Sequence, residues 1–196
     1  RDLIDFKSRF TATHTAGVAA CAVKIAELFG MAGVDVKAMR IAGNFHDIGK
    51  IVIPNSILEK EGRLTEQEFA VIKCHTYYTY HTLNSIKGLH RIAEWAGFHH
   101  EKLDGSGYPF RCSAEDIGTG SRIIAVSDIF TAISEDRPYR RGMTKDEIYN
   151  TIKDQTDNGK LDKRIVEILF DNYNLINEQV KKEQISAQKF YENRFQ

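Results

Sequence analysis

The sequence predicts an all-α fold built as one helical bundle. Apolar residues recur at helical rather than alternating spacing along most of the chain, and only three prolines interrupt its 196 residues. Hydrophobic residues make up 42% and charged residues 28%, which is the composition of a globular domain rather than of a disordered or fibrous chain. We therefore expect one domain over residues 1–177, followed by a helical extension over residues 178–196.

The charge and the cysteines narrow the choice of partners and compartment. Lys and Arg total 27 and Asp and Glu total 27, so the net charge does not favour duplex nucleic acid or an anionic membrane as a partner. No apolar run reaches the roughly 18 residues that a transmembrane helix needs. Cys21, Cys74 and Cys112 form no CxxC pair, so we expect reduced thiols buried in the core of a cytoplasmic protein. Because the first residue is Arg1 rather than Met, we interpret the chain as a fragment of a longer protein.

The first part of the chain predicts two helices. Thr11 or Thr13 is the expected N-cap of the first helix, which ends near Gly30. Asp35 is the expected N-cap of the second helix, and a loop containing Pro54 follows it. The apolar faces of the two helices carry Val18, Cys21, Ile25 and Leu28 in the first and Met39, Ala42 and Phe45 in the second.

The middle of the chain predicts a third and a fourth helix. Residues 65–68, Thr-Glu-Gln-Glu, form a capping box that opens the third helix. The expected inward face of this helix consists of Phe69, Ile72, Thr76 and Leu83. The fourth helix is expected from Leu89 to His100, and the glycine-rich segment from Leu103 to Gly120 is expected to be a loop.

The remaining segments extend the bundle. The β-branched residues between Ile123 and Ile133 allow a buried strand, but the length of this apolar run and its helical neighbours favour a helix. A second capping box, at residues 144–147, begins another helix, and an apolar pattern continues from Asp162 to Ile176. Beyond Glu178 the apolar residues are isolated, which indicates either a partner or dimer surface or a solvated helix.

Several ionisable residues lie beside apolar positions that should face inward. They are His14, His46, Asp47, His75, His99, His100 and Asp128. A buried ionisable group without a partner costs several kcal/mol, so this group of residues needs shared partners. A metal cluster would be such a shared partner. The alternative is that each residue is hydrogen-bonded separately in the core. The spacing of the residues alone leaves both interpretations open. The donors include no thiolate, which favours iron or manganese, with zinc or nickel as substitutes, over a structural zinc.

Two sequence motifs that contain some of these ionisable residues resemble those of a known family. The first runs from His46 to Lys50, HDIGK, and the second from His99 to Pro109, HHEKLDGSGYP. Together they strongly resemble the HD-GYP family, the metal-dependent cyclic-dinucleotide phosphodiesterases of the HD superfamily. Further matches are Pro54, Leu58, Lys60, Arg122 to Asp128, Arg137 to Arg140 and Gly159 to Asp162. The resemblance covers the chain from about His14 to Leu169.

The resemblance implies an HD-superfamily helical bundle, with a five-helix HD core plus additional C-terminal helices. Residues 1–177 are then an HD-GYP phosphohydrolase domain, in which the seven residues named above ligate two divalent metal ions and Asp47 bridges them. Asp47 and Lys50 are the expected catalytic residues, and Asp104 is expected to brace a metal-bound histidine or the loop. The expected substrate contacts are Lys50, Tyr108, Arg137 and Arg140. Lys50 should reach a phosphate oxygen, the two arginines suit phosphate or a guanine edge, and the tyrosine suits a base or a phosphate. The alternative is that the cations are solvated surface charges and the loop is a rigid cover.

The resemblance also implies a reaction, the hydrolysis of cyclic di-GMP to linear pGpG and onward to GMP in bacterial signalling. Two alternatives stay open. One is hydrolysis of another cyclic dinucleotide, such as a mixed GMP-AMP one, and the other is a non-catalytic module that binds a cyclic dinucleotide or a protein. The expected partners are the cyclic dinucleotide and an N-terminal sensory or receiver domain, and a homodimer is compatible with the sequence.

The chain departs from the family pattern at a few positions. Thr76 and Thr79 stand where a Pro and a Gly usually follow the histidine of the third helix. Thr131 stands where many members have a second Asp, so we expect one contact that supports the metal ligands to be missing. Members that hold a third ion carry a Glu one helical turn before the first histidine; Phe10 stands there, so we expect two ions. No departure removes an expected ligand.

Overall fold

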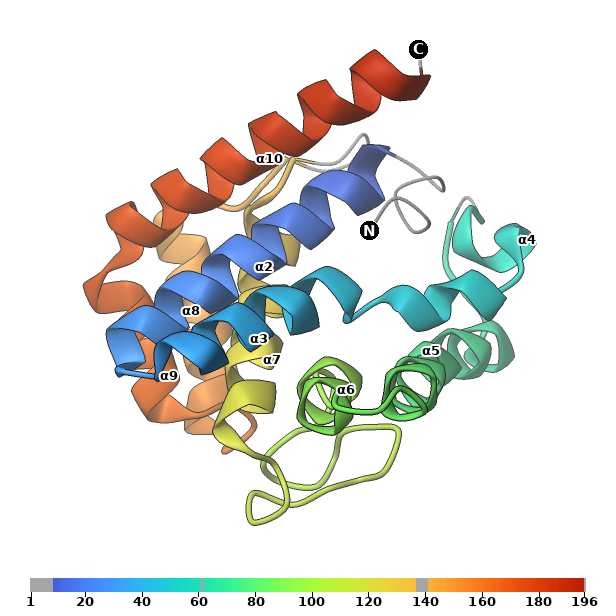
Figure 1. The fold of residues 1–196 in the computed structure, drawn as a ribbon, viewed down its shortest axis with the longest axis horizontal. Coiled ribbons are helices and arrows are strands. Elements are labelled where there is room, and N and C mark those ends of the chain that lie inside the picture. Colours follow the sequence, from blue (N-terminus) through green and yellow to red (C-terminus); the bar gives the residue numbers. More distant parts are fainter. Residues whose placement is uncertain (1–8, 61, 137–140, 196) are drawn as a thin grey trace.

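The structure, a computed structural model, describes residues 9–60, 62–136 and 141–195. These residues form helices joined by loops, with no β-strand among them beyond an isolated bridge between Asp104 and Ser113. The prediction of an all-α bundle is therefore confirmed (Figure 1). No helix in the described ranges has the length and apolar character needed to cross a membrane.

Helix α2 is the element along which several other helices pack, namely α3, α7, α9 and α10. In chain order the elements are α2 (Arg9–Phe29), α3 (Gly33–Phe45), the 3₁₀ helix η1 (Ile48–Val52), α4 (Asn55–Leu58), α5 (Glu66–Asn84), α6 (His90–Gly97), α7 (Thr119–Ser134), α8 (Lys145–Asp157), α9 (Lys163–Asp171) and α10 (Tyr173–Phe195). Figure 1 shows α10 lying along α2 at one side of the bundle and α5 and α6 at the opposite side. The long loop between α6 and α7 lies beyond them.

The packing of α2 depends on small side chains. This helix contacts α3, α7, α9 and α10. Its buried alanines are Ala12, Ala16, Ala19, Ala20, Ala22 and Ala26. They let neighbouring backbones come close, since a Cβ atom on Gly43 of α3 would lie only 2.7 Å from the Cα atom of Ala19. The close crossing of α2 and α3 brings the rings of His14 and His46 to 5.5 Å between centroids.

The starts of the first two helices differ from the expectation. Thr11 and Thr13 lie inside α2, so neither caps it. The N-cap position of α3 is Ala32, and Asp35 lies within the first helical turn. The Asp35 carboxylate instead pairs with Arg91 of α6 at 2.6 Å, so a contact between helices rather than capping determines its place.

Most other boundaries match the expectation. α2 ends beside Gly30, whose φ of +88° suits the glycine that commonly follows a helix. Thr65 caps α5 and Thr144 caps α8, each in a capping box with the glutamate three residues further on. The apolar run in α7 is a helix, so the strand alternative is wrong. The fourth expected helix is shorter than expected, because α6 ends at Gly97 and the histidine pair lies in the turn after it.

The buried face of α5 is mostly polar. Phe69, expected on this face, is 45% exposed. The buried residues of the helix are His75, Thr76, Thr79 and Leu83. The reason is that α5 packs against η1 and α6, the elements that surround the candidate site. The orientation of α5 therefore serves the site as well as the core.

The C-terminal apolar pattern is divided between two helices, which meet at Asn172. The second of them, α10, continues without a break through the expected boundary between residues 177 and 178 and packs along α2. Val180 is buried, whereas Ile185 and Phe190 remain exposed.

The three cysteines have different surroundings. All are free thiols, and Cys21 is buried, Cys112 is partly buried and Cys74 is exposed. The expectation that all three fill the core is thus wrong for Cys74, because α5 turns the neighbouring His75 rather than this thiol inward.

Candidate metal centre

The first part of the site is the turn that carries His46 and Asp47 from the end of α3 into η1. This turn lies directly against α5, where a Cβ atom on Gly49 would lie 2.0 Å from the carbonyl oxygen of His75. Thr79 of α5 stabilises this contact with two hydrogen bonds. Its hydroxyl donates to the carbonyl oxygen of His46 at 2.9 Å and accepts from the N–H of Gly49 at 3.0 Å. The threonine that departs from the family pattern therefore joins two parts of the site.

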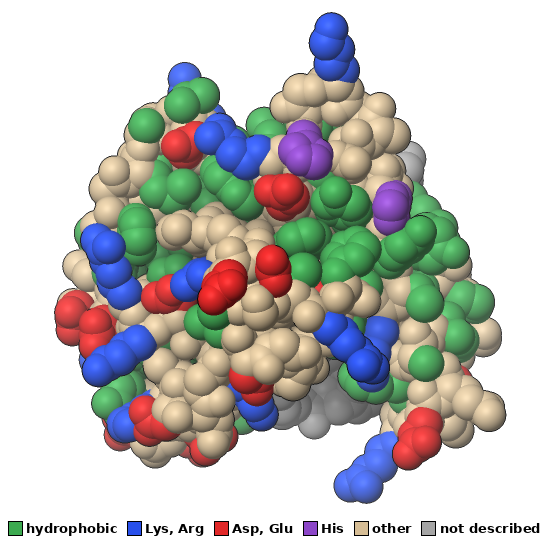
Figure 2. Space-filling model, turned by 90° about the horizontal axis from the view of Figure 1, so that it is seen from below, with side chains coloured by type: hydrophobic (Ala, Val, Ile, Leu, Met, Phe, Trp, Pro, Cys, Tyr) green, Lys and Arg blue, Asp and Glu red, His purple; other side chains and the backbone are tan. Residues whose placement is uncertain are grey.

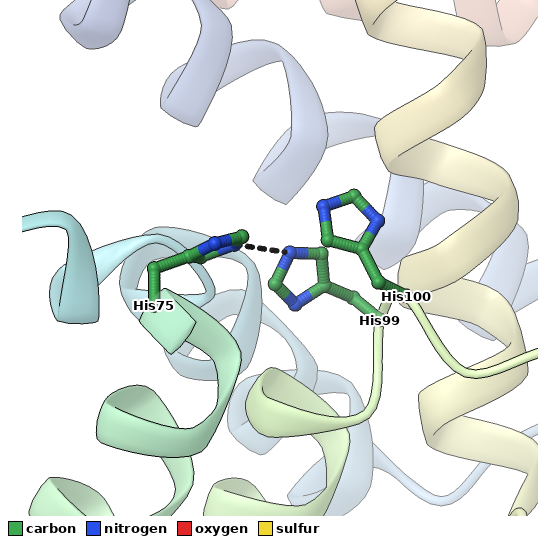
Figure 3. Close-up of side chains that lie close together, drawn as sticks. All are labelled: His75, His99 and His100. Carbon is green, nitrogen blue, oxygen red and sulfur yellow. Dashed lines mark hydrogen bonds between the residues drawn. The ribbon is translucent and has the colours of Figure 1, made fainter. Parts of the chain in front are cut away.

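The structure brings all seven expected ligands together. They form three overlapping groups whose donor atoms lie within 4.8 Å of one another: His14, His46 and Asp128; His46, Asp47 and His99; and His75, His99 and His100. Figure 3 shows the last group, with His75 from α5 pointing toward the two histidines that follow α6. Residues from α2, α5 and α7 and from the turns after α3 and α6 thus converge on one centre.

Asp47 lies between the other ligand candidates. Its Oδ1 atom is 3.3 Å from Nε2 of His75 and 3.9 Å from Nε2 of His99. Its Oδ2 atom is 3.4 Å from Nε2 of His46. The two oxygens of one carboxylate therefore face two different sets of imidazoles, which is the arrangement that a bridging carboxylate needs.

Asp128 closes the other side of the centre. It projects from α7, where its Oδ1 atom is 3.1 Å from Nε2 of His14 and 3.9 Å from Nε2 of His46. Its Oδ2 atom is 3.9 Å from Nδ1 of His100. Next along α7, Thr131 is buried and its hydroxyl has no hydrogen-bond partner in the described part of the chain.

Backbone carbonyls orient three of the imidazoles. The Nδ1–H groups of His46, His75 and His99 donate to carbonyl oxygens three residues earlier in the chain, at 2.8, 2.7 and 2.6 Å. A carbonyl oxygen can only accept, so the Nδ1 atom carries the proton and Nε2 is left with its lone pair. The same tautomer is selected at many metal-binding histidines.

Several donor atoms lack the proton or cation that would satisfy them. Nε2 of His75 and Nε2 of His99 lie 3.3 Å apart (Figure 3), although both rings already use their Nδ1 proton elsewhere. Nε2 of His46 and Oδ1 of Asp47 are buried and have no hydrogen-bond partner among the described residues. Unsatisfied buried polar atoms are rare and costly, and a bound cation would satisfy these atoms together. The residues present therefore fit a metal centre.

The charge states of His99, His100 and Asp47 also suit metal binding. Burial lowers the pKa of His100 to about 4, and burial together with His100 holds the pKa of His99 well below its usual value. Burial opposes ionisation of Asp47, but Lys50 and His46 outweigh it and hold the pKa of this carboxyl well below its usual value. Neutral imidazoles and ionised carboxylates are the forms that bind metals.

The loop after α6 is held by Glu101, a residue for which the sequence predicted no role. Glu101 is buried, and its carboxylate accepts the backbone N–H groups of Phe110, Arg111 and Cys112 at 2.7 to 3.2 Å. The only indication of this role in the sequence was that Glu101 directly follows the histidine pair. Three N–H groups on one carboxylate fix the loop beside the centre, and the Tyr108 ring lies 4.9 Å from the His100 ring, centroid to centroid.

The other expected site residues have distinct surroundings. Lys50 Nζ is 2.6 Å from Oδ2 of Asp47, and about a third of its side chain is exposed at the edge of the centre. Asp104 accepts from the N–H and hydroxyl of Ser106, so it braces the loop. Arg137 and Arg140 lie outside the described residues.

An all-α bundle closed around five imidazoles and two carboxylates, with an adjacent His-Asp pair among them, defines a protein of the HD superfamily. A family model described as HD domain matches residues 1–165. With its two motifs the chain belongs to the HD-GYP family. The family implies binding of divalent metal ions, and the clusters described above are able to hold them.

Named relatives are similar over most of the chain. The 3'3'-cGAMP-specific phosphodiesterase 1 of Vibrio cholerae is 38% identical over 171 residues, which cover 87% of this chain and 40% of that protein. A cyclic di-GMP phosphodiesterase of Thermotoga maritima is 38% identical over 153 residues, which cover 77% of this chain and 42% of that protein. The chain thus spans less than half the length of these relatives.

Two solved structures share the fold. The HDG"Y"P protein Bd1817 from Bdellovibrio bacteriovorus superposes with a TM-score of 0.65 at 15% identity, covering 82% of this chain and 51% of that chain. The HD domain of the L. monocytogenes phosphodiesterase PgpH superposes with a TM-score of 0.54 at 20% identity, covering 92% of this chain and 93% of that chain.

Proposed function

We propose that this chain is a metal-dependent phosphodiesterase that hydrolyses cyclic di-GMP to linear pGpG and onward to GMP. The observation that carries the proposal is Asp47, whose two oxygens face two different sets of imidazoles. The names of several relatives support the reaction, since those of Thermotoga maritima, Xanthomonas campestris and Pseudomonas aeruginosa are all cyclic di-GMP phosphodiesterases.

In this proposal the seven clustered residues hold two divalent ions. His14, His46 and Asp128 serve one ion, His75, His99 and His100 serve the other, and Asp47 serves both. The thiolate-free donors favour iron or manganese, with zinc or nickel as substitutes. Two such ions, when bound, supply a water of lowered pKa and positive charge for the phosphate oxygens.

The residues around the centre position the substrate. Lys50, at the exposed edge beside Asp47, is placed to donate to a phosphate oxygen, and Tyr108 offers its ring or its hydroxyl to the nucleotide. Arg137 and Arg140 remain proposed substrate contacts because they match the family motif.

A mixed GMP-AMP cyclic dinucleotide is the second candidate substrate. Three relatives from Vibrio cholerae are named 3'3'-cGAMP-specific phosphodiesterases, and they are 36% to 40% identical to this chain. A non-catalytic module is the third candidate, and the complete set of seven clustered residues speaks against it.

One product assay separates these candidates. The protein is loaded with Mn²⁺ or Fe²⁺ under reducing, oxygen-free conditions and incubated with cyclic di-GMP or with 3'3'-cGAMP, and the products are separated by chromatography. We expect cyclic di-GMP to give pGpG and then GMP. Turnover of 3'3'-cGAMP alone would favour the second candidate, and nucleotide binding without turnover would favour the third.

We further propose that the domain is the output unit of a longer cytoplasmic protein with an N-terminal sensory or receiver domain. One relative is named a response regulator, and the relatives extend well beyond the matched region. Exposed Ile185 and Phe190 on α10 are compatible with a homodimer contact.

We expect the loaded protein to retain about two ions per chain after desalting. Among the described residues, the clustered donors are the seven already assigned, and residue 10, one turn before His14, is a phenylalanine. A third ion would depend on shared ligands and water, so it should exchange readily. Elemental analysis checks this expectation, and three tightly held ions would contradict it.

We expect Lys50→Ala to lower turnover at least tenfold, on the order of 1.4 kcal/mol in the activation free energy. The reason is the loss of one charge placed to stabilise the phosphate, whereas the imidazoles and carboxylates of the centre are unchanged. Metal content should therefore stay near that of the wild type. Loss of metal together with activity would show that the lysine instead supports Asp47.

A further inference from the structure

A groove lies beside the metal centre, between α5 and the loop that follows α6. Its volume is about 510 Å³. It is lined by Lys73, Cys74 and Tyr77 of α5 and by residues 105–109 and Arg111 of the loop. None of the seven clustered residues lines it. Figure 2 views the molecule from this side, and hydrophobic side chains gather on the right of the view, where Figure 1 places α5, with Lys and Arg side chains among them.

Tyr108 lies between the groove and the metal centre. Its ring lies 4.9 Å from the His100 ring on one side, and Nζ of Lys73 lies 5.7 Å from the ring centroid. Tyr77 forms another aromatic part of the lining, and its ring is held against His81 at 4.1 Å between centroids. Tyr108 therefore borders both the metal centre and the groove.

Arg111 is the second cationic residue of the groove, after Lys73, and its backbone conformation is strained. Its φ is +58°, the left-handed region that costs a non-glycine residue roughly 1–2 kcal/mol. The buried Glu101 holds this conformation by accepting the N–H of Arg111 at 3.2 Å. The side chain itself is exposed and lines the groove. Strained backbone conformations are often found at ligand-binding sites, and here the strained residue places an exposed guanidinium in the groove.

We propose that the groove binds the second nucleotide of the substrate, the half whose phosphate is not at the metal centre. This inference rests on the proposed function, because a cyclic dinucleotide has two bases and two phosphates and only one phosphodiester reacts at a time. Tyr108 and Tyr77 supply ring faces for the second base. Lys73 and Arg111 supply the positive charge for the second phosphate.

The test compares two substrates in four proteins: the wild type, Lys73→Gln, Arg111→Gly and the control Lys87→Gln, which removes an exposed charge outside the groove. The substrates are cyclic di-GMP and bis(p-nitrophenyl) phosphate, a small diester without a second nucleotide. Each groove variant should raise KM for cyclic di-GMP about tenfold, as expected for one charge-assisted contact, and leave kcat nearly unchanged. Hydrolysis of the small diester, the metal content and every property of the control should match the wild type.

Arg111→Gly separates binding from folding. Glycine adopts a positive φ without strain, so this variant should melt no lower than the wild type while it binds the dinucleotide more weakly. Calorimetric titration of the metal-free proteins with pGpG gives the same comparison without turnover, because the proposed hydrolysis needs the metal ions, and we expect Kd to rise about tenfold in both groove variants.

The outcomes distinguish the two proposals. If KM for cyclic di-GMP and Kd for pGpG are unchanged in the groove variants, the groove does not bind the second nucleotide, whereas the proposed function stands. An equal loss with both substrates also overturns the proposed role of the groove, since the variants would then disturb the metal centre. If the wild type cleaves only the small diester, the proposed function fails. The Kd values for pGpG then show by themselves whether the groove binds a nucleotide.

Discussion

Asp47→Asn is expected to release metal from both halves of the centre and to lower turnover at least a hundredfold. One oxygen of this side chain faces His75 and His99, and the other faces His46, so both halves depend on it. Asparagine keeps the shape but loses the charge and replaces one oxygen with an NH₂ group that cannot accept. Removing one partner of a buried charge pair costs about 3–5 kcal/mol, which corresponds to at least two orders of magnitude in rate or affinity.

Elemental analysis and the product assay measure the two effects, and circular dichroism checks that the helices remain. Asp104→Asn is the matched control, because Asp104 is an exposed carboxylate of the neighbouring loop that accepts only from Ser106 in the described structure. This control should keep its metal. An Asp47→Asn protein that retained two ions and wild-type turnover would rule out a bridging role for Asp47.

Local sequence signals predicted the helices whose boundaries depend on nearby residues. The capping boxes at Thr65 and Thr144 are satisfied by glutamates three residues away, so a short stretch of sequence contains all the partners. The apolar run of α7 lies buried between helices, as its length and neighbours indicated. The seven residues of the centre were also predicted: the two motifs contain four of them, and the family resemblance relates His14, His75 and Asp128 to these four.

Features that depend on distant contacts were predicted less well. Asp35 pairs with Arg91 of another helix, and that partner cannot be found from the sequence around residue 35. Phe69 was placed inward by its apolar character, but η1 and α6 select the polar face of α5 instead. Glu101 contacts backbone N–H groups about ten residues further on, which have no side-chain signature at all.

Thr79 illustrates how a departure from a family pattern can be misjudged from sequence. The sequence indicated only that Thr79 stands where the family usually has a glycine. In the structure its hydroxyl bonds to both His46 and Gly49, at the closest approach of α5 and η1. The metal centre therefore depends on how closely these two backbones approach, which residue identity alone does not reveal.

Gly49→Ala is expected to lower the stability of the protein and to empty the metal centre. The new Cβ atom would lie 2.0 Å from the carbonyl oxygen and 2.9 Å from the carbonyl carbon of His75, and 2.7 Å from the amide nitrogen of Thr79. These are backbone atoms of a long helix, so η1 has to move away. Overpacking of this kind costs about 3 kcal/mol, which lowers Tm on the order of 10 °C in a chain of this length.

The same displacement moves Asp47, two residues before Gly49, away from His75. Their 3.3 Å approach then opens, and the halves of the centre lose their shared carboxylate. Gly33→Ala is the matched control, because Gly33 lies at the start of α3, has no positive φ, and a Cβ atom added there would meet nothing within 4 Å. Thermal unfolding and elemental analysis of the two variants check the expectation. If Gly49→Ala kept both its Tm and its metal, contact between η1 and α5 would not be what assembles the site.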